Sequence, residues 1–217
     1  MYTLYNNDCM KYNGDVHARL MLTDIPYTVI NRESNGIRSF DKGNADTKTF
    51  DLLEWLEKWY EHYDICVIFC GNEQYSTIYD FFASKHKNDG TTRQIVWCKS
   101  NPSPVNCQYV YMSATENAVM FKKKGTGLLN NKYQKNYLEF PIGSSKIHPT
   151  EKNHKLLESL ILNLTKDGDI ILDPCTGSGS TGLVALKNNR RFYGIELDKE
   201  WYEIAKSRLE DFMKNYD

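Results

Sequence analysis

The sequence has none of the features that mark a membrane-spanning or secreted protein. No apolar run approaches the ~20 residues that a transmembrane helix needs. Residues 1–8 show no basic start followed by an apolar stretch, which a secretion signal would require. We therefore expect a cytoplasmic protein without membrane contact.

The sequence also lacks an excess of charge of either sign. Lysine and arginine number 27 and aspartate and glutamate 28, which gives a formal net charge of −1. A protein that holds nucleic acid through its overall charge would be strongly basic. Any contact with nucleic acid must therefore come from a local basic patch.

Cysteine is present but not in a metal-binding arrangement. The six cysteines form no pair of C-x-x-C clusters, so we expect no zinc or other metal site. Most of them lie in apolar surroundings, which is typical of buried, reduced thiols.

What the sequence does have is an alternation of strand and helix patterns, without repeats or low-complexity tracts. The 217 residues fit a single domain covering residues 1–217. The pattern predicts an α/β fold with a mostly parallel sheet. Residues 28–48 are expected to form a long loop, and residues 122–147 show turn signals without sustained periodicity. The expected strands are residues 2–5, 18–23, 64–70, 94–98, 117–121, 169–172 and 191–196, and the expected helices are residues 50–60, 74–85, 151–164, 180–188 and 199–213.

The strongest cofactor signal lies in residues 170–182, where an apolar strand leads into small residues and a helix begins at once. Gly177 and Gly179 allow a sharp turn and let a ligand lie against main-chain N–H groups. Glu196 ends the next strand, where a carboxylate can accept hydrogen bonds from both ribose hydroxyls. This pattern predicts a nucleoside-type cofactor. Gly182 occupies the third position of the dinucleotide fingerprint, so spacing alone leaves NAD and S-adenosylmethionine both open.

The tetrapeptide Asp24-Ile25-Pro26-Tyr27 directly follows an apolar strand. An exocyclic base amine is a poor nucleophile, because its lone pair is conjugated into the ring. The Asp24 carboxylate and the Ile25 carbonyl can each accept one of its N–H groups, and Pro26 keeps Ile25 extended. Tyr27 offers a ring on which a flipped base can stack. The tetrapeptide therefore predicts direct methyl transfer assisted by orientation and electrostatics. An ordinary turn is the simpler alternative.

Together these motifs resemble the beta group of amino-methylating DNA methyltransferases, which place a D-P-P-Y tetrapeptide before the cofactor loop. Ile25 replaces the first proline of that tetrapeptide, and Asn153 replaces a proline in another motif. Further segments are similar to the family's motifs: residues 7–9 to G-D-C, residues 97–104 to W-x-K-x-N-P-x-P, residues 148–157 to H-P-T-E-K-P-x-x-L-L, residues 173–179 to D-P-F-x-G-S-G, and residues 191–196 with Tyr202, Ala205 and Arg208 to a G-I-E segment followed by Y, A and R.

The resemblance implies a Rossmann-like class I methyltransferase fold with a circularly permuted motif order. Its seven-stranded, mostly parallel sheet would contain one antiparallel strand. The implied cofactor is S-adenosylmethionine, with Asp8 beside its adenine and His148, Thr150 and Lys152 beside its methionine end. The full set of expected cofactor contacts is Asp8, Cys9, His148, Thr150, Lys152, Asp173, Pro174, Thr176, Gly177, Ser178, Gly179, Glu196 and Leu197.

We expect DNA contacts in residues 122–147, a target-recognition segment that is short for the family. Lysines there can neutralise phosphates, and the interleaved aromatic residues can stack. A solvated polar loop is the alternative interpretation. The expected DNA contacts are Lys99 and Asn101, from the segment near the target pocket, with Lys122, Lys123, Lys124, Lys132, Tyr133 and Lys135.

The predicted function is methylation of adenine N6 in DNA, as part of a restriction-modification system. Adenine is favoured because Asp24 leads the tetrapeptide, whereas the cytosine-N4 enzymes of the family more often carry serine there. The predicted catalytic residues are Asp24, Ile25, Pro26 and Tyr27. Two alternatives stay open: a cytosine-N4 methyltransferase, and a non-catalytic subunit that binds cofactor or DNA and needs a partner. By analogy with the family, we expect a homodimer.

Overall fold

The computed structural model of the chain describes residues 1–27, 50–104, 107–127, 129–131, 133–143 and 151–215. The expected loop at residues 28–48 lies outside the described residues. So do three of the predicted contact residues, Lys132, His148 and Thr150.

The described strands form one sheet in the order β1-β8-β7-β2-β3-β5-β4-β6. Strand β5 runs antiparallel to both of its neighbours, and the other pairs are parallel. The α/β class and the single reversed strand are therefore confirmed. The strands are β1 (Tyr2–Asn6), β2 (Ala18–Asp24), β3 (Tyr63–Cys70), β4 (Gly90–Lys99), β5 (Thr115–Lys123), β6 (Tyr137–Phe140), β7 (Ile170–Asp173) and β8 (Arg191–Glu196).

The predicted count of seven strands is wrong, because the described residues contain eight. The additional strand is β6, the outermost of the described strands on its side of the sheet, where its described pairing partner is β4. Its four residues alternate between exposed and half-buried. A strand this short is held by main-chain hydrogen bonds, so it does not need the longer apolar alternation on which the prediction depended.

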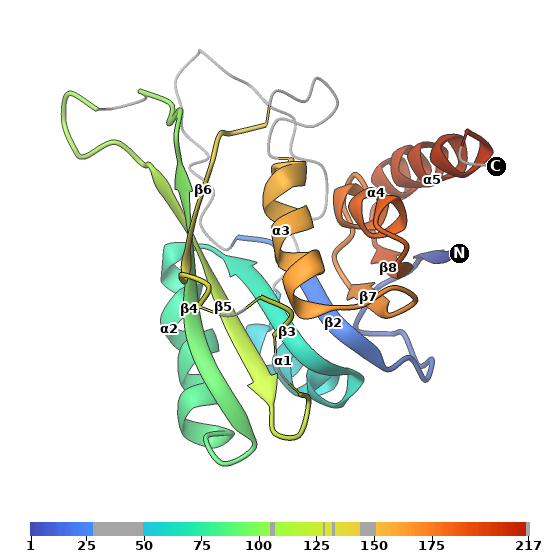
Figure 1. Ribbon diagram of the computed structural model, residues 1–217, viewed down its shortest axis with the longest axis horizontal. Coiled ribbons are helices and arrows are strands. Elements are labelled where there is room, and N and C mark those ends of the chain that lie inside the picture. Colours follow the sequence, from blue (N-terminus) through green and yellow to red (C-terminus); the bar gives the residue numbers. More distant parts are fainter. Residues whose placement is uncertain (28–49, 105–106, 128, 132, 144–150, 216–217) are drawn as a thin grey trace.

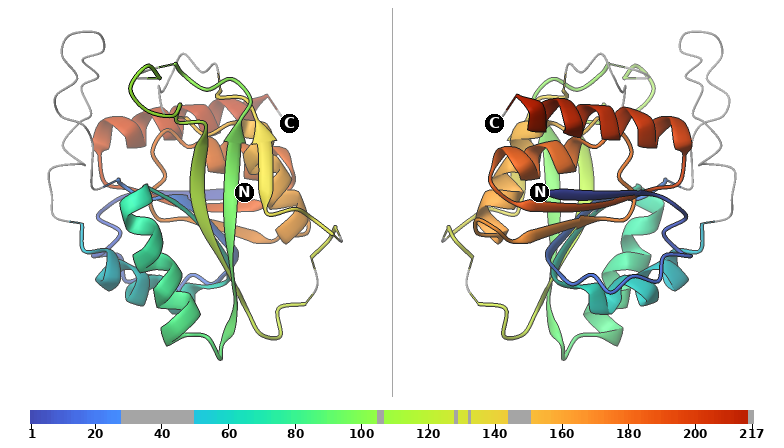
Figure 2. Two further views of the ribbon diagram at one scale, coloured as in Figure 1. Left: turned by 90° about the vertical axis from the view of Figure 1, so that its left-hand side faces the viewer. Right: turned by 90° about the vertical axis from the view of Figure 1, so that its right-hand side faces the viewer.

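Helices cover both faces of the sheet (Figure 1). Helices α1 and α2 pack on one face, while α3, α4 and α5 pack on the other. Figure 2 shows α5 (red) and α2 (teal) on opposite sides of the sheet. All five predicted helices are present. Their bounds are α1 (Leu52–Trp59), continued by a 3₁₀ turn η2 (Tyr60–His62), α2 (Asn72–Asp80), continued by a π-helical turn η3 (Phe81–Lys85), α3 (His154–Leu164), α4 (Ser180–Lys187) and α5 (Lys199–Lys214).

Strand β3 explains why the core has two halves. Its side chains are buried on both faces, with Ile68 facing α1 and α2 and Val67 facing α3. A strand covered on both sides reads as a continuous apolar run, as the sequence shows here. Burial raises the pKa of the Cys66 and Cys70 thiols to about 12, so both are protonated and unreactive at neutral pH.

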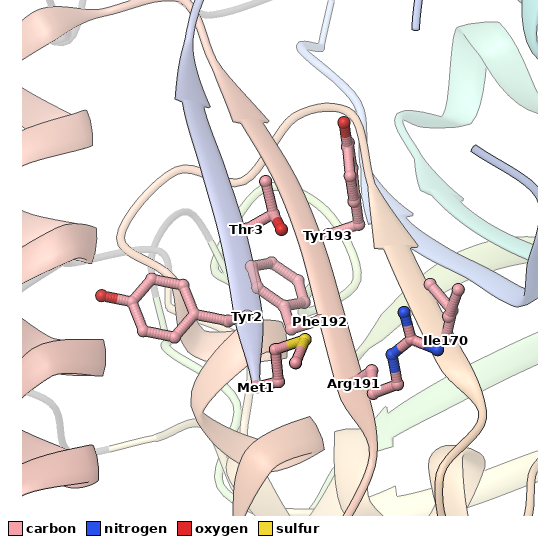
Figure 3. A pocket seen from close by; sticks show the side chains of 7 residues that line it. All are labelled: Met1, Tyr2, Thr3, Ile170, Arg191, Phe192 and Tyr193. Carbon is pink, nitrogen blue, oxygen red and sulfur yellow. The ribbon is translucent and has the colours of Figure 1, made fainter. Parts of the chain in front are cut away.

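The parallel strands bring the predicted motifs to one edge of the sheet. The carboxyl ends of β1, β8, β7, β2 and β3 share that edge, and ligands of open α/β sheets bind beyond it. The opposite edge holds a small cavity of about 30 Å³ at the amino ends of β1, β7 and β8, lined by Tyr2, Ile170, Arg191 and Tyr193 among others (Figure 3). A cavity of this size has room for only about two water molecules, so the carboxyl edge is the candidate site.

Two kinds of feature are absent from the described residues. Within those ranges, no helix is long and apolar enough to cross a bilayer. In the same part of the chain, no cluster of three or more His, Cys, Asp or Glu residues is arranged to hold a metal ion.

Candidate active site

The glycine loop has the backbone that the sequence predicted. Gly177 and Gly179 adopt φ values of +53° and +80°, in the left-handed region that favours glycine. A Cβ atom at Gly179 would lie 3.0 Å from the Cβ of Ala205, so this glycine lets the loop pack on α5. A Cβ atom at Gly177 would meet no described atom within 4 Å. Gly177 therefore leaves open space where a ligand can approach the backbone.

Glu196 contacts this loop directly. Its Oε2 accepts a hydrogen bond from the Gly177 N–H at 2.7 Å, and its Oε1 accepts one from the Asp198 N–H at 2.8 Å. Burial raises the pKa of Glu196, and these two bonds oppose that rise. Each carboxylate oxygen has a second lone pair, so Glu196 can still accept hydrogen bonds from a ribose. The next residue, Leu197, is 41% exposed.

The segment after β1 reaches the same edge. Strand β1 pairs with β8 as far as Asn6 and Glu196, and Asp8 follows, its Oδ1 accepting from the Met10 N–H at 2.9 Å. The thiol of Cys9 is hydrogen-bonded to that of Cys175, which lowers the pKa of Cys9 and raises that of Cys175. Cys9 therefore lies beside the glycine loop and Asp8 precedes it, and a contact of either residue with a cofactor stays a prediction.

Asp173 lies inside the protein and joins the cofactor loop to the reaction tetrapeptide. Its Oδ1 accepts hydrogen bonds from Thr23 Oγ1 at 2.7 Å and from the Cys175 N–H at 3.2 Å. Only 2% of Asp173 is exposed, and burial raises its pKa to about 7. Its role here is to shape the loop. The other predicted contacts that are buried in the loop are Pro174, Thr176, Ser178 and Gly179.

Glu151 and Arg208 tie the loop to two helices, a role that the sequence did not reveal. Glu151 Oε1 accepts from Ser180 Oγ at 2.6 Å and from Arg208 Nη2 at 2.7 Å. Arg208 Nη1 also donates to the Ser178 carbonyl at 2.7 Å. Both residues belong to recognised motifs, but their pairing across 57 positions becomes visible only when the chain folds.

The predicted tetrapeptide is anchored by main-chain hydrogen bonds at the end of β2. Asp24 is the last residue of the strand, and the Ile25 N–H donates to the Phe69 carbonyl at 3.2 Å. Gln74, which is 3% exposed, donates from Nε2 to the Pro26 carbonyl at 2.8 Å. Sequence reasoning missed Gln74, because a polar residue in the first turn of a helix is ordinary.

Lys152 lies against Asp24, which the resemblance did not predict. Its Nζ is 2.5 Å from Asp24 Oδ2 and 3.0 Å from Glu116 Oε2, and the residue is only 9% exposed. Lys99 Nζ lies 2.9 Å from Glu116 Oε1. Four side chains thus form a chain of contacts with alternating charge: Lys99, Glu116, Lys152 and Asp24.

The pKa values of the two carboxyl groups in this series of contacts, Asp24 and Glu116, are shifted in opposite directions. Burial raises the pKa of Asp24, although the Lys152 ammonium works in the opposite direction. Burial also acts to raise the pKa of Glu116, but Lys152 and Lys99 together outweigh it and hold that pKa below its usual value. The pKa of Lys152 lies well above its usual value, because nearby anionic groups outweigh its burial. Lys152 is therefore a cation.

Tyr27 completes the centre. Its hydroxyl is 3.4 Å from Lys152 Nζ, and the centre of its ring is 5.6 Å from that atom. Burial raises the pKa of Tyr27, so the ring is a neutral phenol. The side chain of Asp24 is 34% exposed, which leaves this carboxyl group accessible from solvent.

Lys99 and Asn101 lie at the same edge as Asp24. Lys99 is the last residue of β4, and Asn101 Oδ1 accepts from the Ile142 N–H at 2.5 Å. The adjoining segment carries exposed aromatic side chains that the sequence analysis did not single out, with Tyr109 80% exposed and Tyr111 fully exposed.

The structure does not bring residues 122–124 to this edge. They follow Glu116 along the reversed strand β5, so six residues of strand, about 20 Å, carry them toward the opposite edge. Lys123 Nζ is bonded there to Glu61 at 3.2 Å. Of the other predicted DNA contacts, Tyr133 is 98% exposed and Lys135 Nζ donates to the Tyr137 hydroxyl at 2.8 Å.

Comparison with known proteins gives a family match and close relatives. A family model described as DNA methylase, N6_N4_Mtase, matches residues 18–207. The chain is 41% identical over 122 residues to the Type II methyltransferase M2.DpnII of Streptococcus pneumoniae, and 39% identical over 121 residues to M2.LlaDCHI of Lactococcus lactis subsp. cremoris. Each match covers 55% of this chain and 42% of the relative, so the matched part spans less than half of either relative.

Two solved structures show the same architecture over nearly the whole chain. The M1.HpyAVI–SAM complex is 32% identical, with a TM-score of 0.75 over 96% of this chain and 100% of that one. The PvuII DNA methyltransferase, described as cytosine-N4-specific, is 15% identical, with a TM-score of 0.67 over 99% of this chain and 91% of that one. At that identity the likeness shows the fold alone.

Proposed function

The chain belongs to the N6/N4 DNA methylase family, and we propose that it transfers a methyl group from S-adenosylmethionine to the N6 amine of adenine in DNA. One observation carries the proposal. The Thr23–Asp173 hydrogen bond, 2.7 Å long, joins the strand that ends in Asp24 to the strand that enters the glycine loop. The groups that would hold the methyl acceptor and the methyl donor therefore lie side by side.

The residues present at the carboxyl edge fit an S-adenosylmethionine cofactor. Gly177 has an open side, Glu196 has lone pairs free for ribose hydroxyls, and Asp8 lies beside them. M1.HpyAVI, which is described as a SAM complex, matches 96% of the chain at 32% identity and supports this assignment. When bound, the cofactor supplies an electrophilic methyl group on sulfur. The contacts expected of His148 and Thr150 stay predictions.

At the acceptor side, the chain would act mainly by orienting the base. Asp24 accepts one N–H of the amine and the Ile25 carbonyl accepts the other, which favours the pyramidal nitrogen that attacks the methyl group. The ring of Tyr27 stacks on the flipped base. Its neutral hydroxyl and the adjacent ammonium of Lys152 set the electrostatic field at this position. No covalent intermediate with the protein is needed.

DNA would approach the edge that carries Asp24. Lys99 and Asn101 lie there, and the exposed rings of Tyr109 and Tyr111 can stack on bases or wedge between them. Residues 122–124 stay a predicted DNA contact, but one that would need the duplex to reach the far end of β5. The expected homodimer, the restriction-modification role and the cytoplasmic location also stay predictions, and a DNA substrate is consistent with each of them.

The test is methyl transfer by the purified chain. Double-stranded DNA is incubated with the chain and S-adenosylmethionine labelled in the methyl group, and the nucleosides are separated after digestion. We expect N6-methyladenine, and we expect Asp24→Ala to lose at least 100-fold in kcat while it still binds S-adenosylhomocysteine. N4-methylcytosine as the product would favour the cytosine alternative. If Asp24→Ala labels DNA at the wild-type rate, the mechanism is rejected. If the chain is active only together with a second protein, a subunit role is favoured.

A further inference from the structure

Glu116 has no role in the proposed reaction so far, but it is linked to Asp24 through Lys152, which contacts both carboxylates. It belongs to the first residues of β5, and its side chain is 22% exposed. Each of its oxygens has its own cation, with Lys99 Nζ 2.9 Å from Oε1 and Lys152 Nζ 3.0 Å from Oε2. A carboxylate enclosed in this way holds two lysines at fixed positions.

The contact that matters is the one between Lys152 and Asp24. Lys152 Nζ lies 2.5 Å from Asp24 Oδ2, while Asp24 Oδ1 is buried and has no hydrogen-bond partner in the described part of the chain. The exposed part of the Asp24 carboxylate therefore includes the oxygen that already binds the ammonium. A substrate amine that approaches from solvent must share that oxygen with Lys152.

The sharing of this oxygen affects how well Asp24 can stabilise the transition state of methyl transfer. The bond between sulfur and the methyl carbon would break as the bond to the amine nitrogen forms, so that S-adenosylhomocysteine leaves with the electron pair. Positive charge would develop on the nitrogen until its extra proton passes to solvent, and nearby negative charge stabilises that transition state. Asp24 and Lys152 alone would form a neutral pair, and Lys99 would add one excess positive charge. Glu116 cancels this excess and gives the Lys152 ammonium a second carboxylate, at 3.0 Å against 2.5 Å for Asp24.

We propose that Glu116 is a positioning residue of the reaction: by sharing the Lys152 ammonium with Asp24, it leaves the Asp24 carboxylate enough negative charge to hold the substrate amine. The inference rests on the proposed function, because it assumes that Asp24 accepts hydrogen bonds from that amine. It adds to the reaction centre a residue that no motif in the sequence identified.

Removing Glu116 and removing Lys152 should shift the pKa of Asp24 in opposite directions. The charged or titratable groups that face Asp24 are Lys152, Glu116, Tyr27, Asp173 and Cys70. Glu116 raises the pKa of Asp24 and Lys152 lowers it. Activity that requires the Asp24 carboxylate is lost as pH falls through its pKa. Removing Glu116 therefore moves the acid limb of the kcat profile to lower pH, and removing Lys152 moves it to higher pH.

The experiment compares kcat–pH profiles of the full chain with those of Glu116→Gln and Lys152→Met, using DNA and S-adenosylmethionine at saturation. For Glu116→Gln we expect the plateau of kcat to fall between about 10-fold and 100-fold and the acid limb to move to lower pH. For Lys152→Met the limb should move to higher pH. Glu203→Gln, on the exposed side of α5, removes one carboxylate elsewhere and should match the wild type.

If Glu116→Gln has the wild-type plateau of kcat, the proposal is overturned. It is also overturned if the plateau falls while the acid limb of the kcat–pH profile stays at the wild-type pH, because a merely structural role would have that effect. If Glu116→Gln does not fold, Glu116→Asp replaces it. That variant keeps the negative charge but places it farther from Lys152. The plateau of kcat should therefore fall, and the acid limb should move to lower pH by less than in Glu116→Gln. Wild-type behaviour of Glu116→Asp would then overturn the proposal.

A second readout needs neither substrate nor cofactor. The titration of Asp24 can be followed by NMR in protein labelled with ¹³C at the aspartate carboxyl carbon, with Asp24→Asn identifying the resonance. We expect Asp24 to titrate at lower pH in Glu116→Gln than in the wild type. Absence of methyl transfer by the wild type would reject the proposed function, whereas an unmoved Asp24 titration would reject the role of Glu116 alone.

Discussion

Replacing Asp173 by asparagine should change how the stability of the protein depends on pH. Asp173 is 2% exposed, and burial raises its pKa to about 7 from an ordinary value of 3.8. The folded protein therefore keeps a proton on this group between pH 4 and 7, where the unfolded chain has already lost it. Stability from this group is complete below pH 4 and is lost as pH rises through 7. At about 1.4 kcal/mol per pH unit, the loss is roughly 4 kcal/mol.

Asp173→Asn removes the titration while keeping the shape of the group. The amide oxygen can still accept the hydrogen bonds from Thr23 and from the Cys175 N–H. The difference in the free energy of unfolding, variant minus wild type, should therefore rise by about 4 kcal/mol between pH 4 and pH 8. The variant should be the more stable protein at the upper end of that range.

The assay is urea-induced unfolding of both proteins at half-unit steps of pH, followed by tryptophan fluorescence. Asp80→Asn, at the exposed end of α2, controls for the loss of one negative charge at a site remote from the loop. A difference between Asp173→Asn and wild type that stays constant from pH 4 to pH 8 would refute the reasoning. It would mean that Asp173 is ionised in the folded protein and that its hydrogen bonds outweigh its burial.

Two further predictions concern the ligands. Gly177→Ala should weaken binding of S-adenosylhomocysteine more than tenfold in calorimetry, because its methyl group enters the open side of the loop. Gly168→Ala is the control: φ is +82° there against +53° at Gly177 and the space is equally open, so it introduces at least as much backbone strain and should bind normally. Equal losses in both variants would point to strain alone. Replacing Tyr109 and Tyr111 together by alanine should weaken DNA binding about tenfold or more in fluorescence anisotropy. Stronger loss on neutralising residues 122–124 would instead locate the duplex at the far end of β5.

The sequence was enough to predict the fold class and the two motifs of the candidate site. The glycine loop could be predicted because Gly177 and Gly179 adopt backbone conformations that other residues avoid, so residue type alone indicates the shape of the backbone there. The tetrapeptide that begins with Asp24 could be read for the same reason, since a proline fixes the residue before it. Parallel strands then bring both motifs to one edge, whatever the details of side-chain packing.

The partners of the charged groups depended on the tertiary structure. From the sequence, residues 122–124 are interpreted as a basic patch that contacts DNA. Because β5 runs antiparallel, these residues lie toward the other edge of the sheet. The direction of β5 is set by its pairing with β3 and β4. Lys152 read as a cofactor contact, yet its nearest charged groups are Asp24 and Glu116, which are far from it in the sequence. Local sequence determines backbone shape and apolar periodicity. Which charges meet is decided only when distant strands pair, because electrostatic interaction depends on distance in space.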